Sequence, residues 1–312
     1  MKPDILITAP IEPALMAQLD ADFETHRLWS ADDQDGLLAT LADRVTCVVT
    51  RSAVGADAAL MDALPKLELI AVFGVGADKV DLGAARERGI KVTNTPGVLT
   101  EDTADYAIGL LLALARRIVV GDRFVREGGW TKGMLPNSTR VHGKRLGIVG
   151  LGRIGASVAR RAEAFALEIL YTGPSDKPDL PYRYVPDAVS LASQVDFLVL
   201  TCPGGPETRD LVDMRLLKAL GPAGMLINIS RGSVVDETAL ANALSAGVIA
   251  GAALDVFSDE PNVSQALLAA PNLIVEPHIA STTVETRKAI GELVFANVAA
   301  HFAGQPLPSQ LS

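Results

Sequence analysis

The sequence predicts an α/β protein of two domains, in which helices cover parallel sheets. Short apolar runs alternate with helix-like runs from one end of the chain to the other, as they do in successive βαβ units. Nearly half of the 312 residues are apolar and few are aromatic, which is typical of parallel sheets that are buried on both faces. The length suits two domains of ordinary size.

The charge of the chain and the lack of targeting signals limit which partners and which cellular location we expect. The net charge is −9 and no basic block stands out, so we expect neither nucleic acid nor an anionic membrane as a partner. An anionic small molecule fits this composition, because its site needs only one or two local cations. The opening "MKPDILITAP" has too short an apolar run for a signal peptide. The longest apolar stretch, residues 107–115, is well below the ~20 residues that span a bilayer. We therefore expect a soluble, cytoplasmic protein.

The two cysteines, Cys47 and Cys202, lie far apart in apolar, strand-like runs. We expect both to be buried and reduced, as in a reducing cytosol, rather than joined in a disulfide. We predict no metal site.

The first third of the chain is expected to form five strands separated by helical runs. Pro96 and Gly97 then break the pattern, which indicates a hinge. Next comes a helix from about residue 100 to residue 119. It is apolar on most of its circumference, so it must be buried on more than one side. The expected strands are 4–9, 25–29, 46–50, 67–72 and 91–95, and the helical runs include 12–20 and 32–42.

A second α/β series begins at Lys144, after a loop with the exposed-looking Trp130. The tail opens with a capping-box spacing, Thr282 followed by Glu285, and is expected to run as one long helix to Phe302. The expected strands of this series are 145–150, 168–173, 196–202, 224–230, 249–256 and 272–277.

A glycine motif, "GLGRIG", stands directly between the strand at 145–150 and a helix. Gly150 allows a tight turn, Gly152 lets the backbone approach a pyrophosphate, and Gly155 lets helix and strand pack closely. The N-terminus of the helix then faces the phosphates with its N–H groups and positive dipole end. This context predicts dinucleotide binding. Proteins that bind S-adenosylmethionine use similar turns and stay an alternative here.

One of the four histidines has a position suited to chemistry. His278 follows a hydrophobic strand in "LIVEPHIAS", and open α/β sheets carry their active sites at the carboxyl ends of strands. A proton donor to a reacting carbonyl needs a pKa near neutrality, which histidine supplies. The other three, His26, His142 and His301, are expected to be ordinary surface or structural residues.

Two further strand ends carry charged groups. "LINISRGSVVDE" presents Arg231, and "ALDVFSDEP" presents Asp255 and Glu260. A guanidinium can bind a carboxylate with two hydrogen bonds and polarise a neighbouring carbonyl. A carboxylate beside His278 would hold its tautomer and favour the charged imidazolium. Each of these residues alone is more typical of a solvated or salt-bridged group at a strand end. Arg, Glu and His together on three successive strand ends, after a phosphate-binding turn, indicate a functional site.

With these motifs, the chain resembles the D-2-hydroxyacid dehydrogenase family. The motifs are "GLGRIG", "ISRGSVVDE", "DVFSDEP" and "EPHIAS", in the family's order, joined by "FGVGADKVD" near residue 75 and "CPGGPETRDLV" near residue 205. The similarity covers nearly the whole chain. Within the family, it is most similar to the branch of glyoxylate/hydroxypyruvate reductases and hydroxyphenylpyruvate reductases.

The resemblance implies two Rossmann-like lobes with parallel sheets and an active cleft between them. A flavodoxin-like substrate-binding lobe would comprise residues 1–97 with 285–312, and an NAD(P)-binding lobe residues 98–284. The long helix near 100–119 would pack in a homodimer. Trp130 would approach the partner's cleft or serve only as an interface anchor.

The resemblance also assigns roles to residues. His278 would be the proton donor, Glu260 its partner and Arg231 the substrate anchor. The backbone at Val75 and Gly76 would bind the substrate carboxylate. Asp255 would bind the nicotinamide carboxamide, and the remaining cofactor contacts would come from Gly150, Gly152, Arg153, Ile154, Gly155, Cys202, Ile229 and Ser230.

The second strand of the cofactor lobe ends in "LYTG" without the usual acidic residue. An acid at Thr172 or Gly173 would pair with a ribose 2′-hydroxyl and repel a 2′-phosphate. Its absence removes this repulsion, and Thr172, Ser175 and Lys177 can donate to a phosphate. Pro174 stands where NADPH-using relatives commonly have Arg. We therefore predict NADP(H) as the preferred cofactor, with NAD(H) accepted as well.

The predicted activity is reduction of a small 2-oxo acid of the glyoxylate/hydroxypyruvate type to the D-2-hydroxy acid. One alternative is a dehydrogenase for another D-2-hydroxy acid, such as phosphoglycerate, D-lactate or the hydroxyphenylpyruvate product. Another is a non-catalytic, nucleotide-sensing interaction protein. An S-adenosyl-ligand enzyme would leave Arg231, Glu260 and His278 unexplained.

Overall fold

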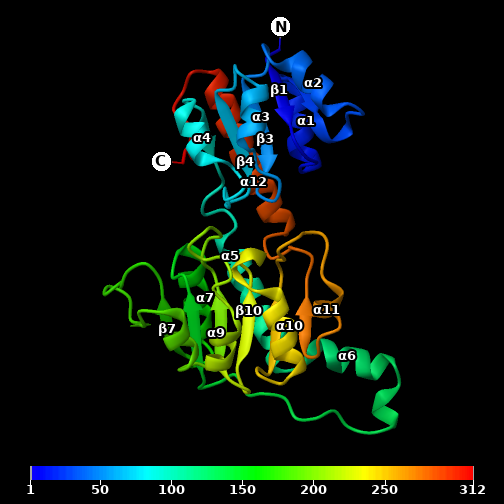
Figure 1. Ribbon diagram of the computed structural model, residues 1–312, viewed down its shortest axis with the longest axis vertical. Helices are drawn as coiled ribbons and strands as arrows, with labels where there is room; N and C mark the ends of the chain where they lie inside the picture. The colour runs from blue at the N-terminus through cyan, green and yellow to red at the C-terminus, as the bar shows by residue number, and fades with distance from the viewer. Residues whose placement is uncertain (1, 312) are drawn as a thin grey trace. The chain divides into compact units, whose positions relative to one another are not determined.

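The computed structural model describes residues 2–311. The chain divides into two compact units, each built around one parallel sheet (Figure 1). Unit 1 comprises Met1–Leu99 and Thr282–Ser312, and unit 2 comprises Thr100–Ser281. The predicted α/β class with parallel sheets is confirmed in both units.

Unit 1 holds a five-stranded sheet in the order β2-β1-β3-β4-β5, which is the flavodoxin-like order. All its strand pairs are parallel. The terminal helix packs against β4 and against α1. The strands are β1 (Asp4–Ile7), β2 (Glu24–Arg27), β3 (Cys47–Arg51), β4 (Leu69–Phe73) and β5 (Lys91–Thr93), and the helices are α1 (Pro13–Asp22), α2 (Gln34–Leu41), α3 (Ala58–Ala63), α4 (Leu82–Glu87) and α12 (Val284–Phe302).

The terminal helix ends at Phe302, as predicted, but its cap lies one residue later than the capping-box spacing indicated. Thr283 is the N-cap, and its hydroxyl accepts a hydrogen bond from the N–H of Thr286 at 3.1 Å. The hydroxyl of Thr282 instead accepts from the guanidinium of Arg287 at 2.9 Å. The expected cap at Thr282 was therefore wrong, because that side chain is engaged elsewhere.

Unit 2 holds a seven-stranded parallel sheet in the order β12-β11-β10-β9-β6-β7-β8. The order reverses between β6 and β9, as in doubly wound dinucleotide-binding folds. Successive strand residues alternate between two cores. One core lies under α5 (Thr100–Ala115) and α7 (Arg153–Glu163), and the other lies under the helices from α8 (Ala188–Ala192) to α11 (Gln265–Leu268). The strands are β6 (Arg145–Val149), β7 (Glu168–Thr172), β8 (Arg183–Tyr184), β9 (Phe197–Leu200), β10 (Met225–Asn228), β11 (Gly251–Leu254) and β12 (Leu273–Val275).

The helices of unit 2 include two that replace a single predicted one. The expected helix from 100 to 119 ends early as α5 (Thr100–Ala115), and α6 (Ile118–Arg126) follows. Arg117 between them has a left-handed backbone, with φ +56°, which interrupts the helical hydrogen bonds. The other helices are α7 (Arg153–Glu163), α8 (Ala188–Ala192), α9 (Met214–Leu220), α10 (Glu237–Ser245) and α11 (Gln265–Leu268).

The two replacement helices differ sharply in burial. Half of α5 is buried, as its apolar circumference predicted. Helix α6 has no buried residue and extends away from the sheet of unit 2 (Figure 1). Within residues 2–311, no helix combines the length and the apolar character that a membrane crossing requires.

Both cysteines are buried and unbridged, as expected. Cys47 lies in β3, where burial raises the pKa of its thiol far above the usual range. Cys202 follows β9, and burial raises the pKa of its thiol to about 11. Neither thiol is therefore a thiolate near neutral pH.

Candidate active site

The glycine turn joins β6 to α7, and each of its glycines meets different surroundings. Gly150 has φ +95°, and a Cβ there would lie 2.7 Å from the backbone of Cys202. A Cβ on Gly155 would lie 2.4 Å from the carbonyl oxygen of Gly150. At Gly152, the N-cap of α7, a Cβ would have no heavy atom within 4 Å. The space over Gly152 and the first turn of α7 therefore fits a pyrophosphate.

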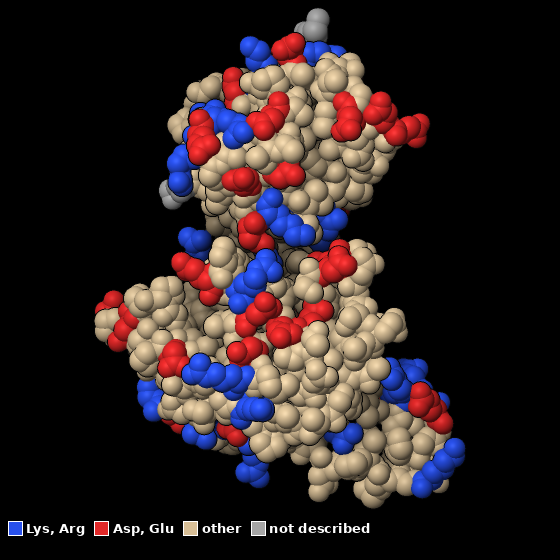
Figure 2. Space-filling view, viewed as in Figure 1, with Lys and Arg blue, Asp and Glu red and all other residues tan. Residues whose placement is uncertain are grey.

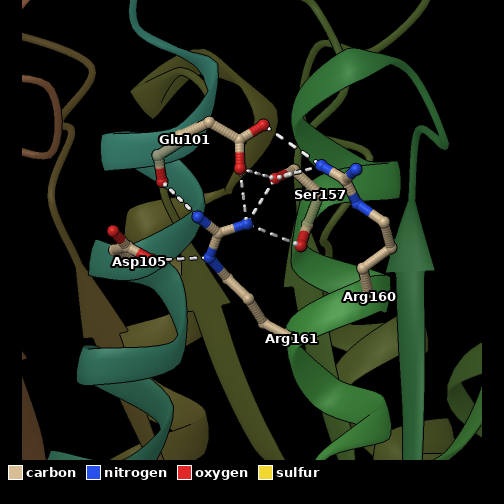
Figure 3. A network of polar contacts seen from close by, with 5 residues as sticks. All are labelled: Glu101, Asp105, Ser157, Arg160 and Arg161. Atoms are coloured by element: carbon tan, nitrogen blue, oxygen red, sulfur yellow. Dashed lines mark hydrogen bonds and ion pairs between the residues drawn. The ribbon is translucent and has the colours of Figure 1, made fainter.

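A polar network holds α7 against α5 (Figure 3). Ser157 of α7 donates to Glu101 of α5 at 2.8 Å, and Arg160 donates to the other oxygen of Glu101 at 3.1 Å. Arg161 contacts Glu101 at 2.8 Å and donates to Asp105 at 2.5 Å. The hydrogen bond from Ser157, followed by that from Arg161, lowers the pKa of Glu101. This network fixes the helix whose N-terminus lies in the glycine turn.

The loop after β7 returns to the glycine turn. Thr172 is buried, Gly173 is half-buried, and Ser175 is exposed. The carbonyl oxygen of Gly173 accepts a hydrogen bond from the hydroxyl of Tyr184 at 3.1 Å. The ammonium of Lys177 donates to the carbonyl oxygen of Leu151, which lies between the first two glycines of the motif. The structure thus brings Lys177 to the glycine turn, which sequence spacing alone did not indicate.

His278 and Glu260 are in direct contact. The Nδ1 atom of His278 lies 2.7 Å from Oε2 of Glu260, and the side chains are 37% and 24% exposed. The second carboxylate oxygen of Glu260 accepts from the N–H of Phe257 at 3.0 Å. Because Nδ1 faces the carboxylate, Nε2 is the ring nitrogen that can serve a substrate. The predicted pairing of these two side chains is thus present in the geometry.

Asp255 lies at the end of β11 and is 1% exposed. Its two carboxylate oxygens accept from the N–H groups of Ile279 at 2.8 Å and Ala280 at 2.9 Å. Burial raises the pKa of Asp255, and these two hydrogen bonds oppose that rise. Asp255 therefore fixes the backbone directly after His278. Each oxygen keeps a second lone pair for a further donor.

Arg231 follows β10 and is half-buried. Its guanidinium donates to the carbonyl oxygen of Ser230 at 2.7 Å, and its own carbonyl oxygen accepts from the side chain of Asn228 at 2.9 Å. Asn228 also accepts from the backbone and the hydroxyl of Ser230, at 3.0 and 2.8 Å. A Cβ on Gly232 would collide with the backbone of Phe257 at 1.8 Å. Asn228 and Gly232 therefore set the turn that presents Arg231.

In unit 1, Val75 and Gly76 follow β4 at the carboxyl edge of its sheet. The carbonyl oxygen of Val75 accepts from the side chain of Asn94 at 2.7 Å, which fixes the loop. The guanidinium of Arg287 lies 5.5 Å from the ring centre of Phe73, the last residue of β4. Burial, and next the charge of Arg51, lowers the pKa of Arg287. Arg287 was not among the predicted residues, because it lies within the long helix α12 and belongs to no recognisable motif.

The predicted residues of unit 2 thus lie at the carboxyl ends of its strands. The glycine turn follows β6, Cys202 follows β9, Arg231 follows β10, and His278 follows β12. Within the part of the chain described here, no group of three or more His, Cys, Asp or Glu side chains could hold a metal ion. Acidic and basic side chains are interspersed over both units on the face in Figure 2. The side chains at these strand ends include an imidazole, from His278, and a guanidinium, from Arg231.

Comparison with known proteins identifies the family. Residues 108–280 match the D-isomer specific 2-hydroxyacid dehydrogenase, NAD binding domain. The chain belongs to the D-isomer-specific 2-hydroxyacid dehydrogenase family. The family and fold predicted from the motifs are therefore confirmed, as is a nicotinamide dinucleotide as the cofactor.

Similar proteins carry related names. The chain is 49% identical over 303 residues, 97% of each chain, to a hydroxyphenylpyruvate reductase of Plectranthus scutellarioides. It is 47% identical over 303 residues, again 97% of each chain, to glyoxylate/hydroxypyruvate reductase A of Arabidopsis thaliana. An NADPH-dependent glyoxylate/hydroxypyruvate reductase from Sinorhizobium meliloti, solved in complex with NADP and malonate, is 43% identical. Its TM-score is 0.94, with 100% of this chain and 97% of that chain covered.

Proposed function

We propose that this protein reduces a small 2-oxo acid of the glyoxylate/hydroxypyruvate type to the D-2-hydroxy acid, with NADPH preferred and NADH accepted. The observation that carries the proposal is the 2.7 Å contact between His278 and Glu260 in a unit with an open glycine turn. The names of the similar proteins support the substrate class.

The proposed roles follow from the chemistry of each side chain. When bound, the nicotinamide supplies a hydride to the carbonyl carbon. His278 donates a proton from Nε2 to the carbonyl oxygen, and Glu260 holds the imidazole by Nδ1. Arg231 binds the carboxylate and stabilises the developing negative charge. Val75 and Gly76, through their backbone N–H groups, are proposed binders of the substrate carboxylate in unit 1.

The cofactor contacts are proposed from the turn and the strand ends. Gly150, Gly152 and Gly155 shape the turn, and the first-turn N–H groups of Arg153 and Ile154 would bind the pyrophosphate. The 2′-phosphate of NADPH would be met at the end of β7, where no acid repels it. The nicotinamide end would be met by Asp255 at its carboxamide. The other proposed contacts are Thr172, Gly173, Ser175, Lys177, Cys202, Ile229 and Ser230.

We also propose a cytoplasmic homodimer. The support for the dimer is the exposed apolar surface of α6, where Ile118 is 57% and Val125 is 54% exposed. Trp130 is 69% exposed and Met134 is 90% exposed in the segment that follows. The two buried, unbridged thiols support the cytoplasm as the location.

One alternative substrate is favoured by a specific observation. The similar protein from Plectranthus scutellarioides is named for hydroxyphenylpyruvate, and it is 49% identical to this chain. An aromatic 2-oxo acid would use the same Arg231 and His278, since only the group beyond the carbonyl differs. The catalytic residues therefore do not distinguish the two substrates, and only the measured rates of reduction can show which one the protein prefers.

A steady-state assay tests the proposal. Loss of absorbance at 340 nm would be measured with NADPH and, in turn, glyoxylate, hydroxypyruvate and hydroxyphenylpyruvate. We expect turnover with the first two, and a loss of kcat by a factor of about 10²–10⁴ in His278→Gln. Circular dichroism and NADPH binding of the variant serve as controls for folding. No turnover with any of the three acids, or full turnover in the variant, would overturn the proposal.

A further inference from the structure

A closed set of hydrogen bonds lies at the end of β7. Tyr171 is fully buried, and its hydroxyl donates to Oδ1 of Asp176 at 2.7 Å. The same hydroxyl accepts from the backbone N–H of Lys177 at 2.6 Å. That N–H also approaches Oδ1 of Asp176 at 2.7 Å. A core tyrosine thus binds two consecutive residues of an exposed loop.

In this arrangement, the carboxylate of Asp176 and the ammonium of Lys177 bind different partners. Oδ1 of Asp176 faces the buried hydroxyl of Tyr171. The side chain of Lys177 reaches the carbonyl oxygen of Leu151 in the glycine turn. The ring centroids of Tyr184 and Tyr171 lie 5.4 Å apart, and this packing further restrains the side chain of Tyr171. The loop is therefore anchored to the core through Tyr171.

The position of these charges bears on the choice of cofactor. In doubly wound folds, the end of the second strand meets the ribose 2′ group of the adenosine. A carboxylate there pairs with a free hydroxyl, whereas an ammonium pairs with a phosphate. Because Asp176 and Lys177 are adjacent in the chain, the conformation of the loop decides which charge faces the 2′ group.

We propose that Tyr171 is the positioning residue for the choice between NADPH and NADH. It holds the carboxylate of Asp176 toward the core, while the side chain of Lys177 extends from the end of β7, where a 2′-phosphate would bind, to the carbonyl oxygen of Leu151. This inference rests on the proposed function, because it concerns the cofactor of the same reaction. It explains how a loop that contains an acid, and Pro174 in place of a further cation, can still favour NADPH.

The hydroxyl of Tyr171 keeps its proton in the neutral pH range. Burial, followed by the hydrogen bond to Asp176, raises the pKa of Tyr171 above its ordinary value. The hydroxyl therefore stays a donor to the carboxylate throughout the neutral range.

The test is the variant Tyr171→Phe, which keeps the ring and removes only the hydroxyl. The ratio of kcat/KM for NADPH to kcat/KM for NADH should fall by about ten-fold, since one charge-assisted hydrogen bond is lost. The effect should lie in KM for NADPH, with kcat at saturating cofactor little changed. The matched control is Tyr182→Phe, because Tyr182 makes a similar bond, at 2.8 Å, to Glu163 of α7 rather than to Asp176 or Lys177. It should leave the ratio unchanged.

Asp176→Asn supplies a second arm that separates orientation from simple charge. If the carboxylate already faces Tyr171, this variant alone should change the cofactor ratio by less than about two-fold. In the Tyr171→Phe background, it should restore much of the lost NADPH preference, which a double-mutant cycle measures. A large gain from Asp176→Asn alone would show that Asp176 faces the cofactor and would overturn the inference.

If Tyr171→Phe lowered kcat/KM equally for NADPH and NADH, Tyr171 would have a purely structural role, and the inference would also be overturned. An unchanged ratio would do the same. Dissociation constants of NADPH and NADH, measured by fluorescence titration, give the ratio without turnover. A failure of the proposed reaction, which shows as a flat trace in the unmodified protein, is thereby distinguished from a failure of this inference.

Discussion

His278 is held both at its ring and at its backbone. Its backbone has φ +56°, which is uncommon for a residue other than glycine. Its N–H donates to the carbonyl oxygen of Glu276 at 3.0 Å, and Asp255 binds the next two N–H groups. The surroundings impose this conformation, and such over-determined backbone is typical of active sites. The imidazole is therefore oriented before a substrate arrives.

At the same scale, the carboxylate of Glu260 should orient the ring of His278 for the proposed reaction. Its contact with Nδ1 of His278 lies at 2.7 Å and leaves Nε2 as the ring nitrogen available to a substrate. Glu260→Gln keeps the size of this side chain but removes its charge, so kcat should fall by about ten-fold or more because the ring is held less firmly. Steady-state rates are measured with saturating NADPH and hydroxypyruvate, and an unchanged kcat would contradict the pairing.

At the scale of elements, the β6–α7 turn contains one glycine, Gly152, beside open space and another, Gly155, in close contact with the backbone. Gly152→Ala adds a methyl group to open space, so the free energy of unfolding should change by less than about 1 kcal/mol. The dissociation constant of NADPH should nevertheless rise by about ten-fold or more, because the methyl group would occupy the proposed place of the pyrophosphate.

The matched variant of this turn is Gly155→Ala. Its methyl group would meet a backbone oxygen at 2.4 Å, so unfolding should become easier by about 1–3 kcal/mol. Urea denaturation and fluorescence titration measure the two effects separately. If Gly152→Ala bound NADPH with unchanged affinity, the pyrophosphate would not lie at this turn.

At the scale of the whole molecule, the proposed homodimer depends on the exposed apolar surface of helix α6. Four apolar side chains of this helix are exposed, namely Ile118, Val119, Val120 and Val125. Light scattering should give twice the mass of one chain, and Ile118→Glu with Val125→Glu should give the mass of one chain. Leu268→Glu, at an exposed apolar position on α11, should leave the dimer intact. A monomeric unmodified protein would contradict the role of α6.

The sequence predicted the glycine turn, the strand-end residues and every strand of both sheets except the two-residue β8, because these features depend on apolar patterns and short motifs. It did not predict the break at Arg117, since a left-handed backbone at an arginine has no signal in local composition. It also placed the cap of α12 one residue early, because two adjacent threonines offer the same hydroxyl. The contacts of Tyr171 were missed for a different reason. A tyrosine in an apolar strand predicts burial but not the partner of its hydroxyl.

The most direct test of the account is the fate of the transferred hydride. Hydroxypyruvate would be reduced with NADPH that carries deuterium at the transferring position of C4, and the product analysed by mass spectrometry and chiral chromatography. We expect one deuterium on C2 of a D-2-hydroxy acid. An unlabelled product, or the L isomer, would contradict direct hydride transfer to the carbonyl carbon in this site.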